Sequence, residues 1–132
     1  MRYLTRQFAI GALRRGNGIE QFLGGVEIDG EPAIRWVAIS PMDRQYRISL
    51  HTVQDPDDDR VGDLPNLTPL DPVDEAYVGE GRELACSENE EEAMALAERL
   101  TDAYPDRWVN HGVAGEEYMD YVRSRRDPAQ AT

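Results

Sequence analysis

Four stretches in which apolar and polar residues alternate fill most of the first 53 positions of the chain. They cover residues 3–14, 19–28, 33–40 and 45–53. Alternation with a period of two is typical of β-strands, and the dipeptides Asn17-Gly18 and Asp29-Gly30 between the stretches are favoured in hairpin turns. Because connections this short join antiparallel neighbours, the sequence predicts an antiparallel β-meander.

Two helices are predicted in the second half of the chain. Ser87-Glu88-Asn89-Glu90 matches a capping box, in which Ser87 and Glu90 satisfy backbone N–H groups at the start of a helix. This helix is expected to run from Ser87 to Tyr104, because a proline follows directly. A second, shorter helix is expected over residues 114–125, where arginines gather at the end that favours cations.

These patterns define an α+β fold in one domain over residues 1–126. We expect an antiparallel β-meander of four to five strands, the fifth over residues 82–86, with two C-terminal helices packed on one face. Residues 54–72, with four prolines and no periodicity, predict a long acidic loop, and residues 127–132 a disordered tail. The side chains expected between sheet and helices are Phe8, Ile10, Phe22, Val26, Ile34, Trp36, Tyr46, Ile48 and Leu50.

The opposite face of the predicted sheet mixes apolar and basic side chains. Its apolar members are Leu23, Val37, Ile39 and Val53. Its basic members are Arg35, Arg47 and His51. Such a face is too apolar to stay in water and too basic to be a core, so either the loop 54–72 or a second copy of the chain is expected to cover it. The homodimer is the preferred expectation, and the three basic residues form a candidate anion site.

Charge is divided unevenly along the chain. The net charge is −12, and residues 1–53 hold seven arginines against five acids, so residues 54–132 carry −14. Phosphate backbones are repelled by such a surface, which argues against a nucleic-acid partner for the second half. The same charge favours a basic protein partner.

The predicted first helix places acids where they are not needed for the helix itself. Glu98 and Asp102 are four residues apart and repel each other, and they lie toward the C-terminal end, where negative charge is disfavoured. The candidate partner-binding acids on the helix and in the loop are Asp57, Asp58, Asp59, Glu91, Glu98 and Asp102.

No metal, cofactor or catalytic residue is predicted. Asp55, Asp57 and Asp59 have the spacing of the first three ligands of an EF-hand, but Arg60 stands where that loop needs glycine and Asn66 where it needs glutamate. Cys86 and His111 are a nucleophile–base pair in principle only, without a local signature. Neither glycine pair extends into a phosphate-binding fingerprint.

Membrane insertion is not expected either. No apolar run approaches the roughly 18 residues that a spanning helix needs. Cys86 is the only cysteine, so no internal disulfide forms, and a cytoplasmic location is expected.

Three functional hypotheses from different classes follow. The first is a non-enzymatic acidic interaction protein, an inhibitor or immunity/antitoxin-type regulator that reaches a basic partner by electrostatic steering. The second is a small-ligand-binding protein or enzyme that uses the anion site of Arg35, Arg47 and His51. The third is a chaperone-like or structural dimer subunit joined through the open sheet face.

Overall fold

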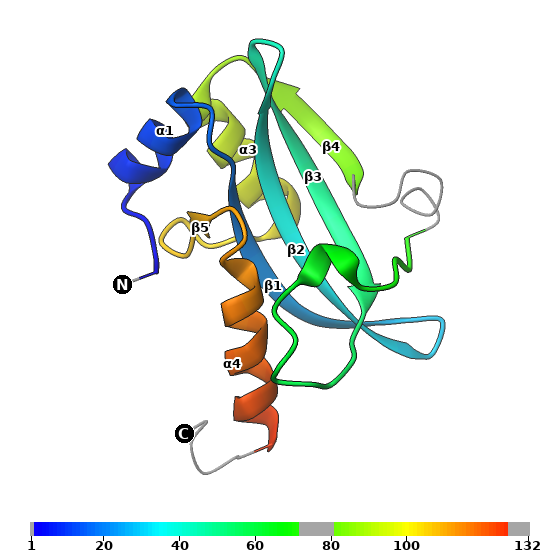
Figure 1. Cartoon of the computed structure of the whole chain (residues 1–132). Helices are drawn as coiled ribbons and strands as arrows, with labels where there is room; N and C mark the ends of the chain where they lie inside the picture. Colours follow the sequence, from blue (N-terminus) through cyan, green and yellow to red (C-terminus); the bar gives the residue numbers. More distant parts are fainter. Residues whose placement is uncertain (1, 72–80, 127–132) are drawn as a thin grey trace.

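The computed structural model describes residues 2–71 and 81–126 (Figure 1). Its elements in chain order are α1 (Arg6–Arg14), β1 (Ile19–Ile28), β2 (Glu31–Met42), β3 (Gln45–Gln54), the 3-10 helix η1 (Leu64–Asn66), β4 (Arg82–Ser87), α3 (Glu90–Thr101), β5 (Val109–Asn110) and α4 (Ala114–Arg126). The strands form one antiparallel sheet of order β4-β3-β2-β1-β5, which confirms the α+β fold. Residue 72 of the predicted loop and the predicted tail 127–132 lie outside the described residues.

The N-terminal segment is the helix α1, and the strand predicted over residues 3–14 is wrong. Thr5 is the N-cap, and its hydroxyl accepts a hydrogen bond from the Phe8 N–H at 3.2 Å. Ala9, Ala12 and Leu13 are buried, at the spacing of one helical face. Phe8, assigned above to the core, is 66% exposed. The period-two alternation was therefore outweighed by the cap and by strong helix formers.

The connection between β2 and β3 is a two-residue turn. Met42 pairs with Gln45, and Asp43 and Arg44 between them have φ values of 47° and 67°. Positive φ at both positions matches the twist of the flanking strands. The turn fixes which residues of the two strands lie opposite one another, and therefore which side chains share a face.

The register divides the apolar residues of β2 between two faces. Trp36 lies opposite His51 of β3, whereas Val37 lies opposite Leu50. Opposed residues of an antiparallel pair share a face, and successive residues of one strand do not. The predicted core layer, which combined Trp36 with Leu50, is wrong for this reason.

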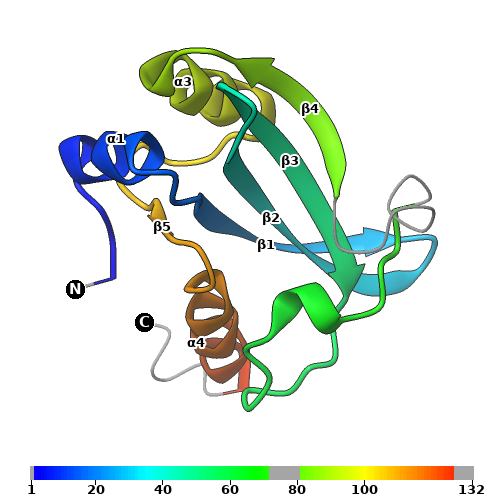
Figure 2. The ribbon, with the colours of Figure 1, turned by 45° about the horizontal axis from the view of Figure 1, so that its top comes forward.

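Each face of the sheet has its own core (Figure 2). α1 and α3 cover the first face, where the buried sheet residues are Ile19, Val37, Ile39 and Ile48. α4 and the segment around η1 cover the second face, where the buried sheet residues are Ile34, Trp36 and Val53. The two C-terminal helices therefore lie on opposite faces and not on one.

The apolar residues for which the loop 54–72 or a second copy was the expected cover are covered by residues of the same chain. Val37 and Ile39 are 0% exposed in the first core. Val53 is 2% exposed but belongs to the second core, and Leu23 packs against the first. Because these four residues do not share one uncovered face, the dimer face predicted from them is wrong.

The helix α3 has its N-cap two residues later than predicted. Asn89 caps it, with Oδ1 accepting from the Glu92 N–H at 2.9 Å. Ser87 ends β4, and its hydroxyl oxygen accepts from the Asn89 N–H at 3.1 Å. The helix ends three residues before its predicted end, because Asp102 adopts a left-handed conformation with φ of 59°.

Candidate functional site

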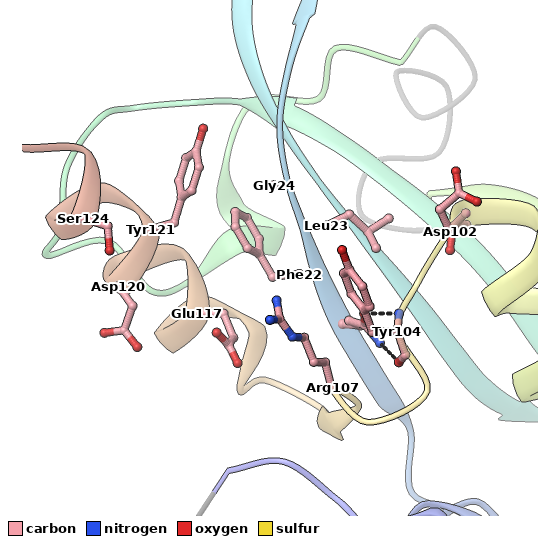
Figure 3. A pocket seen from close by; sticks show the side chains of 12 residues that line it. Phe22, Leu23, Gly24, Asp102, Tyr104, Arg107, Glu117, Asp120, Tyr121 and Ser124 are labelled. Carbon is pink, nitrogen blue, oxygen red and sulfur yellow. Dashed lines mark hydrogen bonds between the residues drawn. The ribbon is translucent and has the colours of Figure 1, made fainter. Parts of the chain in front are cut away.

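A trench runs along the outer edge of β1, between α4 and the segment that joins α3 to β5 (Figure 3). We call it the edge trench, and its volume is about 530 Å³. It is lined by residues 21–24 of β1, by Asp102, Tyr104 and Arg107 of the connecting segment, and by Glu117, Asp120 and Tyr121 of α4. A cavity of this size lies within the usual range for binding sites.

The edge is open because β5 pairs with only the first part of β1. β5 lies opposite Ile19 and Glu20, and the His111 N–H donates to the Gly18 carbonyl at 3.1 Å. Backbone groups of alternate residues point to the same side of a strand. Phe22 therefore turns its N–H and C=O outward as Gly18 does, at a point where no strand within residues 2–71 and 81–126 pairs with it.

Gln21 fixes one wall of the trench. Its side-chain Nε2 donates to the Tyr104 carbonyl at 2.9 Å, and its Oε1 accepts from the Tyr104 N–H at 2.7 Å. Gln21 is 2% exposed, so the two hydrogen bonds are shielded from water. The buried amide thus holds the backbone of the connecting segment beside β1, much as a neighbouring strand would.

Aromatic side chains form the opposite wall. The Phe22 ring lies 5.4 Å from the Tyr121 ring and 6.0 Å from the Tyr118 ring, both in inclined geometry. A Cβ at Gly25 would meet the Tyr121 hydroxyl, so any larger residue there would displace the Tyr121 side chain from its place over β1. The wall is therefore set by packing against the sheet.

Carboxylates outnumber cations in the lining. Asp102, Glu117 and Asp120 face one guanidinium, that of Arg107. The Arg107 guanidinium carbon lies 4.7 Å from the centre of the Tyr104 ring. Figure 3 shows Asp102 on one side of β1 and Asp120 with Glu117 on the other. Asp102 has no ion pair among the described residues, whereas Asp120 and Glu117 share Arg2 and Asp120 also lies 3.5 Å from Arg123.

Glu117 retains hydrogen-bonding capacity. Its Oε2 lies 3.5 Å from Arg2, which also pairs with Asp120 at 2.8 Å. A hydrogen bond to Glu117, together with burial, raises the pKa of Tyr3. Glu117 Oε1 is buried and has no hydrogen-bond donor among the described residues. Such an oxygen gains free energy when a ligand supplies a donor.

Among the described residues that line the edge trench there is no histidine or cysteine, so its hydroxyl groups have no neighbouring imidazole in this part of the chain. In residues 2–71 and 81–126, no group of three or more His, Cys, Asp or Glu side chains is placed to hold a metal ion.

A second cavity, of about 350 Å³, lies on the α4 face of the sheet. The Trp36 and His51 rings stack in it at 4.5 Å and 5°, and Ser49 Oγ lies 3.1 Å from His51 Nε2. Glu20 also lines it and accepts a hydrogen bond from the Ala114 N–H at 3.0 Å. The cavity is therefore polar, and its polar groups already contact one another.

The predicted anion site is only partly assembled. Arg47 and His51 both line the second cavity. Arg35 lies on the other face of the sheet, where its Nε donates to the Thr52 hydroxyl at 3.1 Å. Arg47 Nε also pairs with Glu83 at 3.1 Å. Strand alternation explains the separation, because Arg35 lies opposite Thr52 and not opposite His51.

The aspartates of the loop are paired with arginines of the same chain. Asp57 contacts Arg125 at 2.5 Å, and Asp59 contacts Arg126 at 3.5 Å. Asp58 pairs with the arginine two residues further along, at 3.1 Å. Their predicted role in partner binding remains a prediction, and the structure gives them a role in holding the loop to α4.

The predicted acids of α3 fall into two kinds. Glu98 Oε2 lies 2.6 Å from Arg6 Nη1 and accepts from the Trp108 indole N–H at 2.9 Å, which makes it a link between α1, α3 and β5. Glu91 is exposed, and Asp102 lines the edge trench. Of these three acids, Glu91 and Asp102 have no ion pair among the described residues, and their role in partner binding remains a prediction.

Cys86 and His111 are not brought together. Cys86 lies on β4 and His111 follows β5, so the full width of the sheet separates them. Burial and the charge of Glu83 raise the pKa of the Cys86 thiol, which keeps it protonated and poorly nucleophilic.

The sequence analysis missed the residues that build the edge trench. Gln21, Phe22 and Tyr121 were read only by their place in the strand or helix pattern. One signal was available: Gly24-Gly25 inside a strand indicates a bulge or a close backbone approach. The structure places a register shift between Phe22 and Gly24.

No family model, curated protein or solved structure matches this chain. Within the described residues, no helix combines the length and the apolar character needed to cross a membrane.

Proposed function

We propose that this chain is a non-enzymatic acidic interaction protein that binds a basic partner protein, as an inhibitor or regulator. One observation supports this function best, namely the use of arginine. Among the described residues, nine of the fourteen arginines form ion pairs with carboxylates of the same chain. Most arginines are therefore paired with carboxylates of the same chain. Glu91, Glu92 and Asp102 have no ion pair among the described residues.

The physical consequence is a strong and outward-directed negative field. The chain carries a net charge of −12, and α3 presents Glu91 and Glu92 on its exposed side. Such a field raises the rate at which a basic partner arrives and repels acidic competitors. The rate enhancement falls with ionic strength, because the Debye length is only about 8 Å at physiological salt.

Titration with defined peptides tests the proposal. Two synthetic octapeptides of matched length, one rich in arginine and one in which glutamate replaces each arginine, are compared by fluorescence anisotropy. We expect saturable binding of the basic peptide only, with affinity that decreases as sodium chloride is raised. Equal binding of both peptides, or affinity independent of salt, would contradict the proposal.

Replacement of acids supplies a matched protein control. The double substitution Glu91→Gln and Glu92→Gln removes two exposed charges on α3 without touching an ion pair among the described residues. We expect a slower association rate for the basic peptide at low salt and a loss of roughly 1 kcal/mol in the free energy of unfolding, because both acids lie in the first turn of α3, where the helix dipole favours negative charge. An unchanged association rate would show that the α3 surface does not steer the partner.

A small-ligand site in the second cavity is a second candidate function. Arg47 and His51 share this cavity with the Ser49 hydroxyl, and these donors suit a small anion. Inorganic phosphate is the probe, with Trp36 fluorescence in a Trp108→Phe chain as the readout because the Trp36 ring stacks on His51. A saturable response that His51→Gln abolishes would support this function, and a response that rises linearly with phosphate would contradict it.

A further inference from the structure

The outer edge of β1 is the feature of the molecule that most closely matches a known mode of peptide recognition. Exposed strand edges bind extended peptides by strand addition, in which backbone hydrogen bonds give affinity and side-chain contacts give specificity. β5 already pairs with β1 in this way, but only opposite Ile19 and Glu20. β1 itself continues to Ile28, and within residues 2–71 and 81–126 no strand pairs with this edge beyond Glu20.

The edge trench gives that edge two walls. α4 rises on one side of β1, and the segment held by Gln21 rises on the other. An extended chain of six residues is about 20 Å long, which fits the stretch from Phe22 toward Ile28. Gly24 presents no side chain at this point, and a Cβ built there would meet nothing within 4 Å. A second backbone can therefore approach closely.

The two walls lie on opposite faces of the sheet, which determines the side chains that fit. Successive residues of a strand point to opposite faces. One residue of an added strand would therefore face Asp102, and the next would face Asp120 and Glu117 on α4. Glu117 Oε1, which lacks a donor in the described residues, adds an acceptor on that side. A basic residue would meet Asp102, which has no ion pair among the described residues, and the next basic residue would share Glu117 and Asp120 with Arg2.

A second copy of the chain fits less well. Edge-to-edge pairing of two β1 strands would bring the same carboxylates of each copy toward one another, and like charges in apposition oppose association. Glu27 of β1 is also acidic and exposed, and such a dimer would bring the Glu27 side chains of the two copies closer together. The charge of the trench thus favours a basic chain over a second copy.

We propose that β1 binds an extended basic segment of the partner by strand addition in the edge trench, with adjacent Arg or Lys side chains directed to Asp102 and to Asp120. This inference rests on the proposed function, because it takes the partner to be basic. It adds the place of binding, the conformation of the bound segment and the pattern of its side chains.

N-methylation of the peptide backbone separates strand addition from attraction by charge alone. The probe is an octapeptide with two adjacent arginines among threonines and valines. Its matched control has the same sequence and charge but carries N-methyl groups on consecutive residues, so that neither edge can donate backbone hydrogen bonds. We expect the control to bind about tenfold more weakly or worse, since the loss of two hydrogen bonds is involved. Amide shifts in NMR spectra should concentrate on residues 21–26.

A charge-matched pair of variants tests the walls. Asp102→Asn with Asp120→Asn should weaken binding of the unmethylated peptide severalfold, whereas Glu91→Gln with Glu92→Gln should change its equilibrium affinity less. Circular dichroism checks that both variants fold. Equal loss in the two variants would overturn the assignment to the trench.

The outcomes distinguish this inference from the function on which it rests. Equal binding of the N-methylated and the unmethylated arginine peptides, with amide shifts on α3, would overturn strand addition and leave the proposed function standing. Absence of binding by either peptide would remove both. Shifts along β1 that depend on protein concentration and not on peptide would identify a second copy as the occupant and overturn the inference.

Discussion

The loop after β3 and the helix α3 are both rich in acids, yet their carboxylates are used differently. In the loop, Asp55 accepts from the Tyr118 hydroxyl at 2.6 Å and from Arg125 at 2.7 Å, and its side chain is 3% exposed. On α3, Glu91 and Glu92 are exposed on the outer side of the helix. The loop acids hold the chain together, whereas two of the four acids of α3 face outward without an ion pair among the described residues.

The difference depends on where the arginines lie. The end of α4 carries Arg123, Arg125 and Arg126, and the fold brings it against residues 55–59. α3 has one arginine of its own, Arg99, and only Glu98 and Glu90 receive cations from α1. A count of acids along the sequence therefore overstates the number of unpaired carboxylates in the loop more than it does on α3.

The largest effect is expected for Asp55→Ala. This change leaves the Tyr118 hydroxyl and Arg125 without their shared acceptor at a buried position, and we expect a loss of about 3 kcal/mol in the free energy of unfolding. Urea denaturation followed by circular dichroism measures it. Asp57→Ala is the matched control, because that side chain is 65% exposed and its loss should cost at most about 1 kcal/mol. Equal costs would show that burial does not set the contribution of the loop.

Glu98→Ala should have the next largest effect. It removes the acceptor of the Trp108 indole N–H and the partner of Arg6, and a loss of about 2 kcal/mol is expected from a partly buried, charge-assisted contact. Glu91→Ala, on the exposed side of the same helix, should stay within about 0.5 kcal/mol of the wild type. If the two variants unfold at the same urea concentration, Glu98 is a surface acid like its neighbour.

A smaller effect is expected in how the free energy of unfolding depends on pH in acid. Burial alone would raise the pKa of Asp55, but the hydrogen bonds from Arg125 and Tyr118 outweigh it and leave the pKa below its ordinary value of 3.8. A carboxyl with a depressed folded pKa stabilises the fold fully above its unfolded pKa and loses that contribution as the pH falls through the folded value.

Asp55→Asn should therefore flatten the decline in stability below about pH 4, since the amide does not titrate. Equilibrium unfolding in urea at pH values from 2 to 6 measures this slope. Asp57→Asn, at a carboxylate of the same loop that is 65% exposed, is the control. An equally steep decline in wild type and Asp55→Asn would assign the acid sensitivity to other groups.

The smallest effect is expected for Asp102→Asn. Asparagine tolerates the left-handed conformation at this position, and the change removes a negative charge from the C-terminal end of α3. We expect a gain of a few tenths of a kcal/mol. Differential scanning calorimetry measures it, with Asp102→Ala as the comparison that should lose stability because alanine adopts this conformation less readily. A loss of stability in Asp102→Asn would mean that the carboxylate has a structural partner.

The strands and the C-terminal helices were predictable because local patterns determine them. The Asp29-Gly30 turn fixes β1 against β2, and the apolar spacing of α3 requires a helix whatever it packs against. The N-terminal segment failed because its apolar residues fit both periods. Thr5 followed by Ala9, Ala12 and Leu13 carried the helical signal.

The edge trench could not be predicted from local sequence patterns. It depends on the two-residue length of β5 and on hydrogen bonds between Gln21 and Tyr104, which are 83 residues apart in sequence. The assignment of faces failed for a related reason. Both sides of β2 are apolar, so alternation does not decide which side meets α3, and only the register with β3 does.

The two tryptophans of the chain are placed one in each core, which gives the sheet an optical reporter on either side. Trp108 is fully buried beneath α1 and α3, and Trp36 stacks on His51 in the core beneath α4. In a Trp36→Phe chain the remaining emission follows the first core, and in a Trp108→Phe chain it follows the second. Coincident denaturation curves for the two chains mean that the shared strands couple both sides into one cooperative unit. Curves that separate mean that one face of the sheet melts while the other keeps its packing.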